Sequence, residues 1–244
     1  MIKKLSASVL FCLISLNLCA QNWGGGVDYD RLHFGFTFQY ISSELKVYKK
    51  ANWRDPFYDN SGQMIKDSPY SISSPKSPGF ALGFVSDLKL TENLNLRLTP
   101  LLVFTDRMLD YRYGNEEDNQ LKKTSATMVD IPLGFKIKSD RINNYRAYFI
   151  AGGKYSIDII SKKKTNNELI NDPLEKLVLN KRNFFSYEAG IGLDLYFEFF
   201  KLSPEIKLSN SFGSILHRDK EENAFSQPLD KVFLRNFQFS LYFE

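Results

Sequence analysis

Apolar and polar residues alternate along several stretches of this chain. In the segment VDIPLGFKIKS (129–139), one face is apolar and consists of Val129, Ile131, Leu133, Phe135 and Ile137. Between these residues stand Asp130, Lys136 and Lys138, which are charged. A period of two is typical of a β-strand, whose successive side chains point to opposite sides. The segment therefore predicts a strand whose two faces meet different surroundings.

The same alternation recurs often enough to predict eight strands. They cover residues 32–40, 80–90, 94–113, 129–138, 145–160, 185–195, 202–209 and 233–244. Short connections at 91–93, 140–144 and 197–200 alternate with long ones at about 48–78, 114–124, 162–183 and 214–231. A soluble sandwich also contains alternating strands, but it does not sort its connections in this way and it buries its large apolar side chains.

Regular alternation of short and long connections is the wiring of outer-membrane barrels. The pattern therefore predicts an all-β fold, an eight-stranded antiparallel up-and-down transmembrane β-barrel with short periplasmic turns and long extracellular loops. An even number of strands places both termini on the periplasmic side of a Gram-negative outer membrane. The apolar face of each strand is expected to meet lipid, and the polar face is expected to meet the lumen.

The N-terminus predicts export. The stretch MIKKLSASVLFCLISLNLCAQ has two lysines, an apolar run and a small residue at Ala20, the pattern of a signal peptide cleaved after that residue. Lipidation at Cys19 is the alternative, although Leu18 is bulky where a lipoprotein signal has a small residue. The expected organisation is a signal peptide (1–20), a periplasmic segment (21–31) and the barrel (32–244). Because Cys12 and Cys19 are the chain's two cysteines, the exported chain contains none.

Composition agrees with a barrel and argues against some partners. The 244 residues are 43% hydrophobic and 15% aromatic, and the net charge of +4 is too weak and too scattered to indicate nucleic-acid binding. Eight strands enclose only enough space for side chains, so no water-filled channel is expected. Glycines on the lumen register, including Gly190 and Gly192, make room for charged neighbours.

The inward register carries charges of both signs. Buried charges must be paired, so we expect a network across the lumen that plugs the barrel. It comprises Arg97, Asp130, Arg146, Lys154, Asp158, Glu188, Asp194, Glu205 and Lys207, joined by Arg107 and Lys136. Pro100, Pro132 and Pro204 interrupt predicted strands, and we expect bulges or ladder breaks there, because a closed barrel has no edge to accommodate proline.

Motifs for catalysis are weak. The two histidines, His33 and His217, have no serine on the outward face that would form a hydrolase pair in the wall. AGGKYS (151–156) lacks the spacing of a phosphate loop. SKKKTNN (161–167) is either a solvated basic loop or a contact for lipopolysaccharide phosphates. Asp172 and Pro173 are typical of a helix start, and that helix is expected to cap the barrel mouth. We expect no enzyme, catalytic residue, cofactor, metal or small-molecule substrate.

Several quoted stretches resemble one known family. LHFGFTFQY, LNLRLTPLLVFTDRMLDY, VDIPLGFKIKSDRINNYRAYFIAGGKYSID, EAGIGLDLYFEFFKLSPEIKLS and the terminal SLYFE are similar to the PorT (SprT) family. The residues that carry the resemblance are Phe34, Gly35, Phe36, Asp106, Arg107, Tyr111, Pro132, Leu133, Lys136, Asn144, Tyr148 and Gly152. It extends from about residue 29 to residue 244.

That resemblance implies a role as well as a fold. The family consists of outer-membrane barrels of the type IX secretion and gliding-motility machinery of Bacteroidetes. It implies a non-enzymatic component, needed for translocation or maturation of secreted cargo, whose partners are outer-membrane lipid, lipopolysaccharide and other type IX components. The alternative is a generic small barrel with a structural or adhesive role, or a narrow porin. Composition and periodicity do not separate the two.

Overall fold

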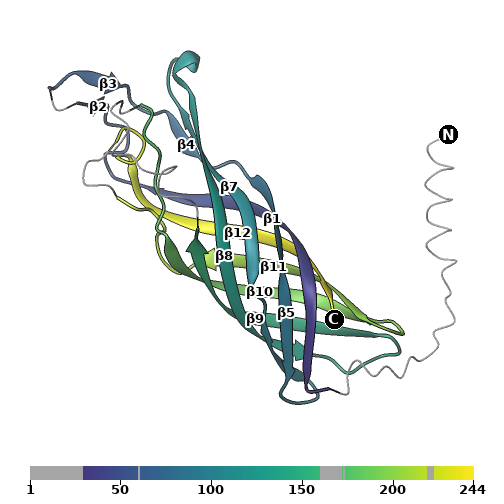
Figure 1. The fold of residues 1–244 in the computed structure, drawn as a ribbon. Coiled ribbons are helices and arrows are strands. Elements are labelled where there is room, and N and C mark those ends of the chain that lie inside the picture. The colour runs from purple at the N-terminus through teal and green to yellow at the C-terminus, as the bar shows by residue number, and fades with distance from the viewer. Residues whose placement is uncertain (1–29, 60, 160–171, 173, 219–222) are drawn as a thin grey trace, which may run out of the picture.

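The computed structural model describes residues 30–59, 61–159, 172, 174–218 and 223–244. The expected signal peptide and nearly all of the segment 21–31 lie outside these residues. Within them, eight long strands close into a barrel (Figure 1). The strands are β1 (Leu32–Lys49), β5 (Ser77–Lys89), β6 (Leu94–Leu98) with its continuation β7 (Leu101–Arg112), β8 (Gln120–Lys138), β9 (Tyr145–Asp158), β10 (Asn183–Tyr196), β11 (Lys201–Ser211) and β12 (Leu229–Phe243).

Each strand pairs with its neighbour in sequence, and the ring closes between the first and the last. β1 pairs with β5 on one side and with β12 on the other, both antiparallel, so that Phe36 opposes both Phe84 and Phe243. The predicted eight-stranded antiparallel barrel is confirmed. Among the described residues, no helix is long and apolar enough to cross a membrane.

Several strands run further than the sequence pattern predicts. β8 begins at Gln120 and not at residue 129, and with β7 it continues far beyond the barrel wall at the end that carries the long loops (Figure 1). The connection expected at 114–124 is therefore 113–119, and it contains a 3-10 turn, η2 (Glu116–Asp118). The 48–78 connection contains three short strands, β2 (Phe57–Tyr58), β3 (Met64–Lys66) and β4 (Ser71–Ser73). The helix expected after Asp172 is not present in residues 174–182, which form a turn and extended chain.

The prolines break ladders without shifting the register. Thr99 and Pro100 separate β6 from β7, yet the pairing of β5 keeps the same register on both sides of the break. Pro132 lies in β8 opposite this break, where its carbonyl accepts a hydrogen bond from the Thr99 N–H. At Pro204, the β10–β11 ladder is interrupted between Gly192 and Leu195. The predicted ladder breaks therefore occur, and no bulge accompanies them.

A continuous apolar band surrounds the half of the barrel near the short turns. In β1 the outward side chains from Leu32 to Tyr40 are mostly large, apolar and exposed, and those of Ser42, Glu44 and Lys46 beyond them are polar. Residues 32–40 of β1, which span this band, cover about 30 Å along the strand. At a tilt of about 45° this length corresponds to roughly 20 Å along the membrane normal. An exposed apolar surface of this extent indicates contact with lipid.

The inward-facing residues change from polar to apolar at the same height at which the outward-facing residues change from apolar to polar. Within the apolar band the inward residues are charged or polar, among them Arg97, Lys136 and Glu205. Beyond the band the inward residues are apolar, as at Leu109 and Val232. The long-loop end of the barrel is therefore organised like a soluble protein, with polar side chains outside and an apolar core inside.

Candidate functional site in the barrel lumen

Arg97 is the centre of a charge cluster near the short turns. Its guanidinium lies 2.7 Å from the Asp87 carboxylate, 2.6 Å from that of Glu244 and 3.6 Å from that of Glu205. The Tyr242 ring lies beneath it, 4.6 Å from the guanidinium carbon. Arg97 comes from β6, Asp87 from β5, Glu205 from β11 and Glu244 from the end of the chain, so one side chain ties strands from opposite sides of the barrel.

Two lysines extend this cluster across the lumen. The Lys136 ammonium lies 2.7 Å from Asp194 and 3.7 Å from Asp87. The Lys201 ammonium lies 2.5 Å from Glu244. All of these side chains are at most 2% exposed, so water is excluded at this level.

A second group of pairs fills the middle of the lumen. Lys154 lies 2.9 Å from Asp130, and Lys207 bridges Glu188 at 3.0 Å and Glu205 at 3.3 Å. Because Glu205 also contacts Arg97, the Lys207 pairs and the cluster around Arg97 are connected. We call these residues, together with the Lys154–Asp130 pair, the lumen network. Side-chain hydrogen bonds support it, since the hydroxyls of Tyr148 and Tyr242 both donate to Glu205 and that of Ser203 donates to Asp194.

Three expected members, Arg107, Asp158 and Arg146, lie at the margins of this network. The Arg107 guanidinium is 3.7 Å from Asp158, whose side chain is 19% exposed, at the top of the polar level. Arg146 is half-buried and stands opposite Asp194 in the β9–β10 ladder.

Three central members were missed by sequence reasoning. Asp87, Lys201 and Glu244 are all buried and all ion-paired. The sequence could have identified Asp87 and Lys201, because both are charged residues on the inward register of their strands. Glu244 gave a weaker signal, because a glutamate after the last outward aromatic, Phe243, looks like a departure from the usual barrel ending rather than an inward side chain.

The residues that carry the family resemblance are spread over the barrel. Phe34, Phe36 and Leu133 face outward in the apolar band, whereas Lys136 and Tyr148 belong to the lumen network. Other members lie where strands approach or connect, namely Gly35 beside Phe243, Gly152 opposite Gly134, Pro132 at the ladder break and Asn144 in the β8–β9 turn. The remaining three, Asp106, Arg107 and Tyr111, follow one another along β7.

The three β7 residues lie at the transition from the apolar band to the long-loop end. Asp106 faces outward and pairs with Lys123 at 2.9 Å, above the apolar band. Arg107, Leu109 and Tyr111 all face inward on β7. Tyr111 is fully buried and its hydroxyl donates a 2.6 Å hydrogen bond to the Phe225 carbonyl. The resemblance therefore follows structural roles in the barrel and not a single pocket.

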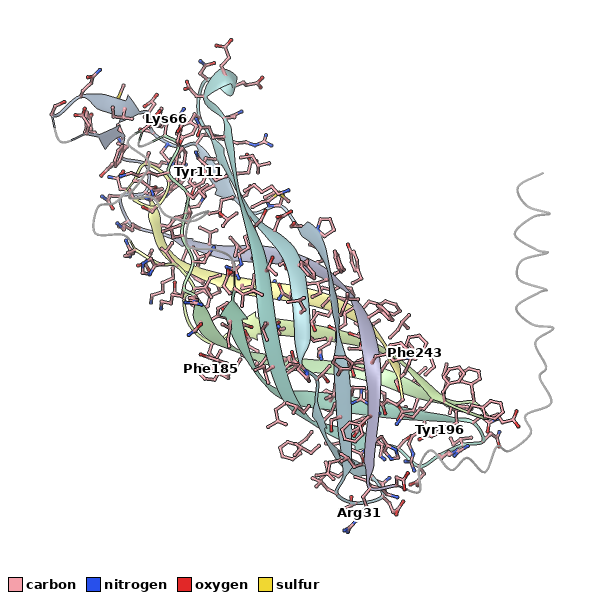
Figure 2. The ribbon with its side chains drawn as sticks, in the orientation of Figure 1. Arg31, Lys66, Tyr111, Phe185, Tyr196 and Phe243 are labelled. Atoms are coloured by element: carbon pink, nitrogen blue, oxygen red, sulfur yellow. The ribbon has the colours of Figure 1, made fainter. Side chains whose placement is uncertain are left out.

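An apolar core closes the lumen at the long-loop end. Its members come from the strands and from the loops that fold inward, including Leu109, Tyr111, Met128, Val178, Phe184, Ile215, Phe225, Leu229 and Val232. Figure 2 shows Tyr111 at this end, where the strands meet the loops, and Phe185 on the outer side of the wall. Val178 belongs to this core and Leu174 packs against it, although the expected helix is not present in residues 174–182.

The outermost loops are tied to the β7–β8 connection by an ion pair. The Lys66 ammonium donates a 2.8 Å hydrogen bond to Asp118 and lies 4.5 Å from the Tyr113 ring centre. This contact holds the pKa of Asp118 below its usual range. Burial raises the pKa of Tyr113 to about 12, so its hydroxyl stays neutral over the physiological range. In the described part of the chain, no three His, Asp or Glu side chains gather where they would hold a metal ion.

Gly192 is needed for the lumen network to pack, because the Tyr148 ring lies against it. A Cβ added at Gly192 would approach the ring carbon and hydroxyl of Tyr148 to 2.4 Å. We expect Gly192→Phe to destabilise the barrel by about 1–3 kcal/mol or more through overpacking, measured by urea unfolding in detergent micelles. Gly153→Ala on β9 is the control, since its Cβ would have only one neighbour, 4.0 Å away. Equal stability of the Gly192→Phe variant and the wild-type protein would show that Tyr148 has room to move.

Comparison with known proteins gives one family match. The family described as outer membrane protein beta-barrel domain matches residues 20–217. A search of the curated proteins finds no match.

Solved structures with a similar chain path include OprG from Pseudomonas aeruginosa, at 9% identity and a TM-score of 0.49, covering 87% of this chain and 93% of that one. Ail from Yersinia pestis is similar at 11% identity and a TM-score of 0.33, with 86% and 96% covered. A Pseudomonas aeruginosa FadL homologue follows at 8% identity and a TM-score of 0.24, with 88% and 90% covered. None of these values supports a transfer of function.

Proposed function

Because this chain belongs to the outer membrane protein beta-barrel domain family, we propose that it is a non-enzymatic outer-membrane component of the type IX secretion and gliding-motility machinery that acts through protein contacts. The observation that carries this proposal is the filled lumen. Buried ion pairs occupy its lower half and an apolar core occupies its upper half. Such a barrel has no path for folded cargo, so a role in secretion falls to its surfaces.

Resemblance to the PorT (SprT) family supports the choice of machinery. The residues that carry it lie in the wall, in the lumen network and along β7 towards the long-loop end. In this proposal the short turns and both termini face the periplasm, which is the orientation of barrels with short turns at one end and long loops at the other. The lipid partners are then outer-membrane phospholipid along the apolar band and lipopolysaccharide around the long-loop end.

The long-loop end offers a surface for protein contacts. The β2–β3 hairpin lies beyond the barrel wall at the long-loop end (Figure 1). Large apolar side chains are exposed on it and after it, with Tyr58 at 53%, Met64 at 54% and Tyr70 at 72%. Exposed apolar side chains that lie outside the lipid band are typical of protein interaction sites. The loop 162–183, the N-terminal segment 21–31 and the rim of short turns are the other candidate surfaces.

Deletion of the gene tests the proposal. Cells without the protein should export type IX cargo across the inner membrane and then retain it, unprocessed, in the periplasm, because the machine lacks a part. A gliding species should also stop moving. Fractionation and immunoblotting of a cargo protein measure this result, and the control is a strain complemented with the wild-type gene.

A generic barrel with a structural or adhesive role is the second candidate, since the family match is broad and names no machine. It predicts a deletion strain that secretes type IX cargo and glides at normal levels. That result would overturn the proposed role and leave an outer-membrane barrel with another task.

A further inference from the structure

The β7–β8 ribbon, which rises beyond the barrel wall (Figure 1), has an open edge on its β8 side. β7 pairs with all of residues 120–130 of β8, whereas β9 joins the other side of β8 only from Met128 onwards. In the part of the chain that the structure describes, no strand pairs with that side of residues 120–127.

The backbone groups of every second residue point to this open edge. The Thr127 carbonyl accepts a 2.9 Å hydrogen bond from the Ile159 N–H, on the side where β9 joins β8. Both backbone groups of a residue point to the same side of an antiparallel strand. The N–H and C=O groups of Leu121, Lys123 and Ser125 therefore point to the open edge, and no described backbone group pairs with them.

Neighbouring strands at the long-loop end have covered edges. β4 pairs with β7 on the side opposite to β8. Next to it, the Ser74 hydroxyl accepts from the Leu45 N–H of β1 and donates to the Met108 carbonyl of β7. On β12, the Val232 N–H donates to the Ser214 hydroxyl. Within the described residues, the edge of β8 has no such cover.

The sequence of this edge does not block pairing. Exposed edges are commonly protected by proline, by bulges or by lysines. Residues 120–127 contain no proline, and their pairing with β7 shows no register shift. The Lys123 ammonium is held over the ribbon by Asp106 of β7, at 2.9 Å. The Lys122 ammonium lies inward, 4.1 Å from the Phe225 ring centre. Neither lysine therefore overhangs the edge.

A second copy of the barrel does not fit this edge in the same membrane. Two copies that share a membrane and an orientation are related by a rotation about the membrane normal. Pairing of two β8 edges needs a twofold axis that is perpendicular to the strand for an antiparallel pair, or along it for a parallel pair. Barrel strands lie at about 45° to the normal, so neither axis coincides with the normal. The edge is therefore available to a chain that is not part of another such barrel.

We propose that an extended acidic segment of another protein outside the membrane adds a strand to β8 at this edge. The free backbone groups from Leu121 to Ser125 suit a segment of about five residues, and added strands of this kind bind mainly through main-chain hydrogen bonds. Residues 120–127 carry two lysines and no acidic residue, so Asp or Glu in the segment complements their charge. Leu121, which is 55% exposed, offers an apolar contact beside them.

This inference rests on the proposed function, because that function places the long-loop end outside the cell and assigns the barrel's role to protein contacts. It names one such contact and the chemistry of the segment that makes it.

Photocrosslinking in cells that produce the full-length protein tests the edge. p-Benzoylphenylalanine in place of Leu121 lies beside the edge and should form an adduct with another protein. Sequencing of the adduct should give a segment that contains Asp or Glu. The same photoreactive residue in place of Met108 is the positional control, because Met108 lies opposite Lys123 on β7, away from the edge. It should not give this adduct.

Ser125→Pro separates strand addition from other kinds of contact. Proline removes the N–H of residue 125, which points to the open edge and not to β7, so the ribbon keeps its ladder. The adduct yield from position 121 should fall about tenfold, because the added strand loses a hydrogen-bond donor. Ser125→Val keeps the N–H and should give the wild-type yield. Both variants must show the heat-dependent gel shift of a folded barrel, and Lys123→Pro replaces Ser125→Pro if that variant fails to fold.

The proposal is overturned if position 121 gives no adduct, if the adduct lies within this chain or joins two copies of it, if the captured segment has no acidic residue, or if Ser125→Pro and Ser125→Val give equal yields. Deletion of the gene separates this failure from failure of the proposed function. If deletion retains cargo while the two yields are equal, the role in secretion stands and the edge contact is wrong. If deletion leaves secretion normal while the adduct depends on residue 125, the edge contact stands and the role in secretion is wrong.

Discussion

Replacing Arg97 with alanine should destabilise the folded barrel by about 3–5 kcal/mol, the usual result of removing one partner from a buried ion pair. Arg97 is 1% exposed and contacts the carboxylates of Asp87, Glu205 and Glu244. Without it these carboxylates stay in the lumen with fewer cations around them, and no water reaches them. Urea unfolding in detergent micelles, followed by tryptophan fluorescence and the gel shift, measures the loss.

Arg235→Ala is the matched control for this prediction. Arg235 also pairs with a glutamate, Glu44, but at 3.4 Å and on the outer surface, where its side chain is 49% exposed. Exposed ion pairs contribute about 0–1 kcal/mol, so this variant should unfold close to the wild type. If both variants lost the same stability, the buried position of Arg97 would have no special importance and the lumen network would not hold the strands together.

Replacing Leu133 with arginine should reduce the stability of the barrel in lipid by roughly 2–4 kcal/mol, because the charge would lie against hydrocarbon. Leu133 faces outward on β8, is 48% exposed and has apolar outward neighbours at Ile131 and Phe135. Folding into lipid vesicles measures the effect, with the fraction of the faster-migrating unboiled band as the readout. Ile191→Arg should act in the same way, since Ile191 is 63% exposed on β10.

Leu121→Arg provides the control on the same strand and face. Leu121 is 55% exposed, but it lies beyond Lys123 and the polar boundary of the band. Its replacement should leave folding unchanged, because water surrounds that part of β8. Equal damage from both substitutions would mean that the apolar band extends to the tip of β8 and that the boundary at Asp106 and Lys123 is misplaced.

The strand alternation predicted the barrel well for a physical reason. Within the band, lipid lies outside the wall and paired charges lie inside it, so apolar and polar residues alternate along each strand. The type of a residue therefore predicts the side it faces, outward for Leu133 and inward for Lys136. The eight strands, their order and the ladder breaks at Pro100 and Pro204 follow from this rule and from the chemistry of proline.

Sequence reasoning failed where the surroundings change along one strand. Beyond Tyr40 in β1, the solvent outside is water, and the apolar residues Ile41 and Leu45 turn inward while Glu44 and Lys46 turn outward. The period of two continues through this exchange, so periodicity alone does not reveal it. The inward-folded loop residues such as Phe225 were missed for a related reason, because loops have no period that indicates which side chains pack into the mouth.

The conductance of the purified barrel in a planar lipid bilayer tests the filled lumen most directly. A continuous lumen network near the short turns and an apolar core at the long-loop end leave no aqueous path, so the reconstituted protein should show no steady current above that of a protein-free bilayer. Incorporation is verified beforehand by the gel shift of the same vesicles. A stable ohmic conductance from the wild-type protein would contradict the filled lumen and would support a narrow porin instead.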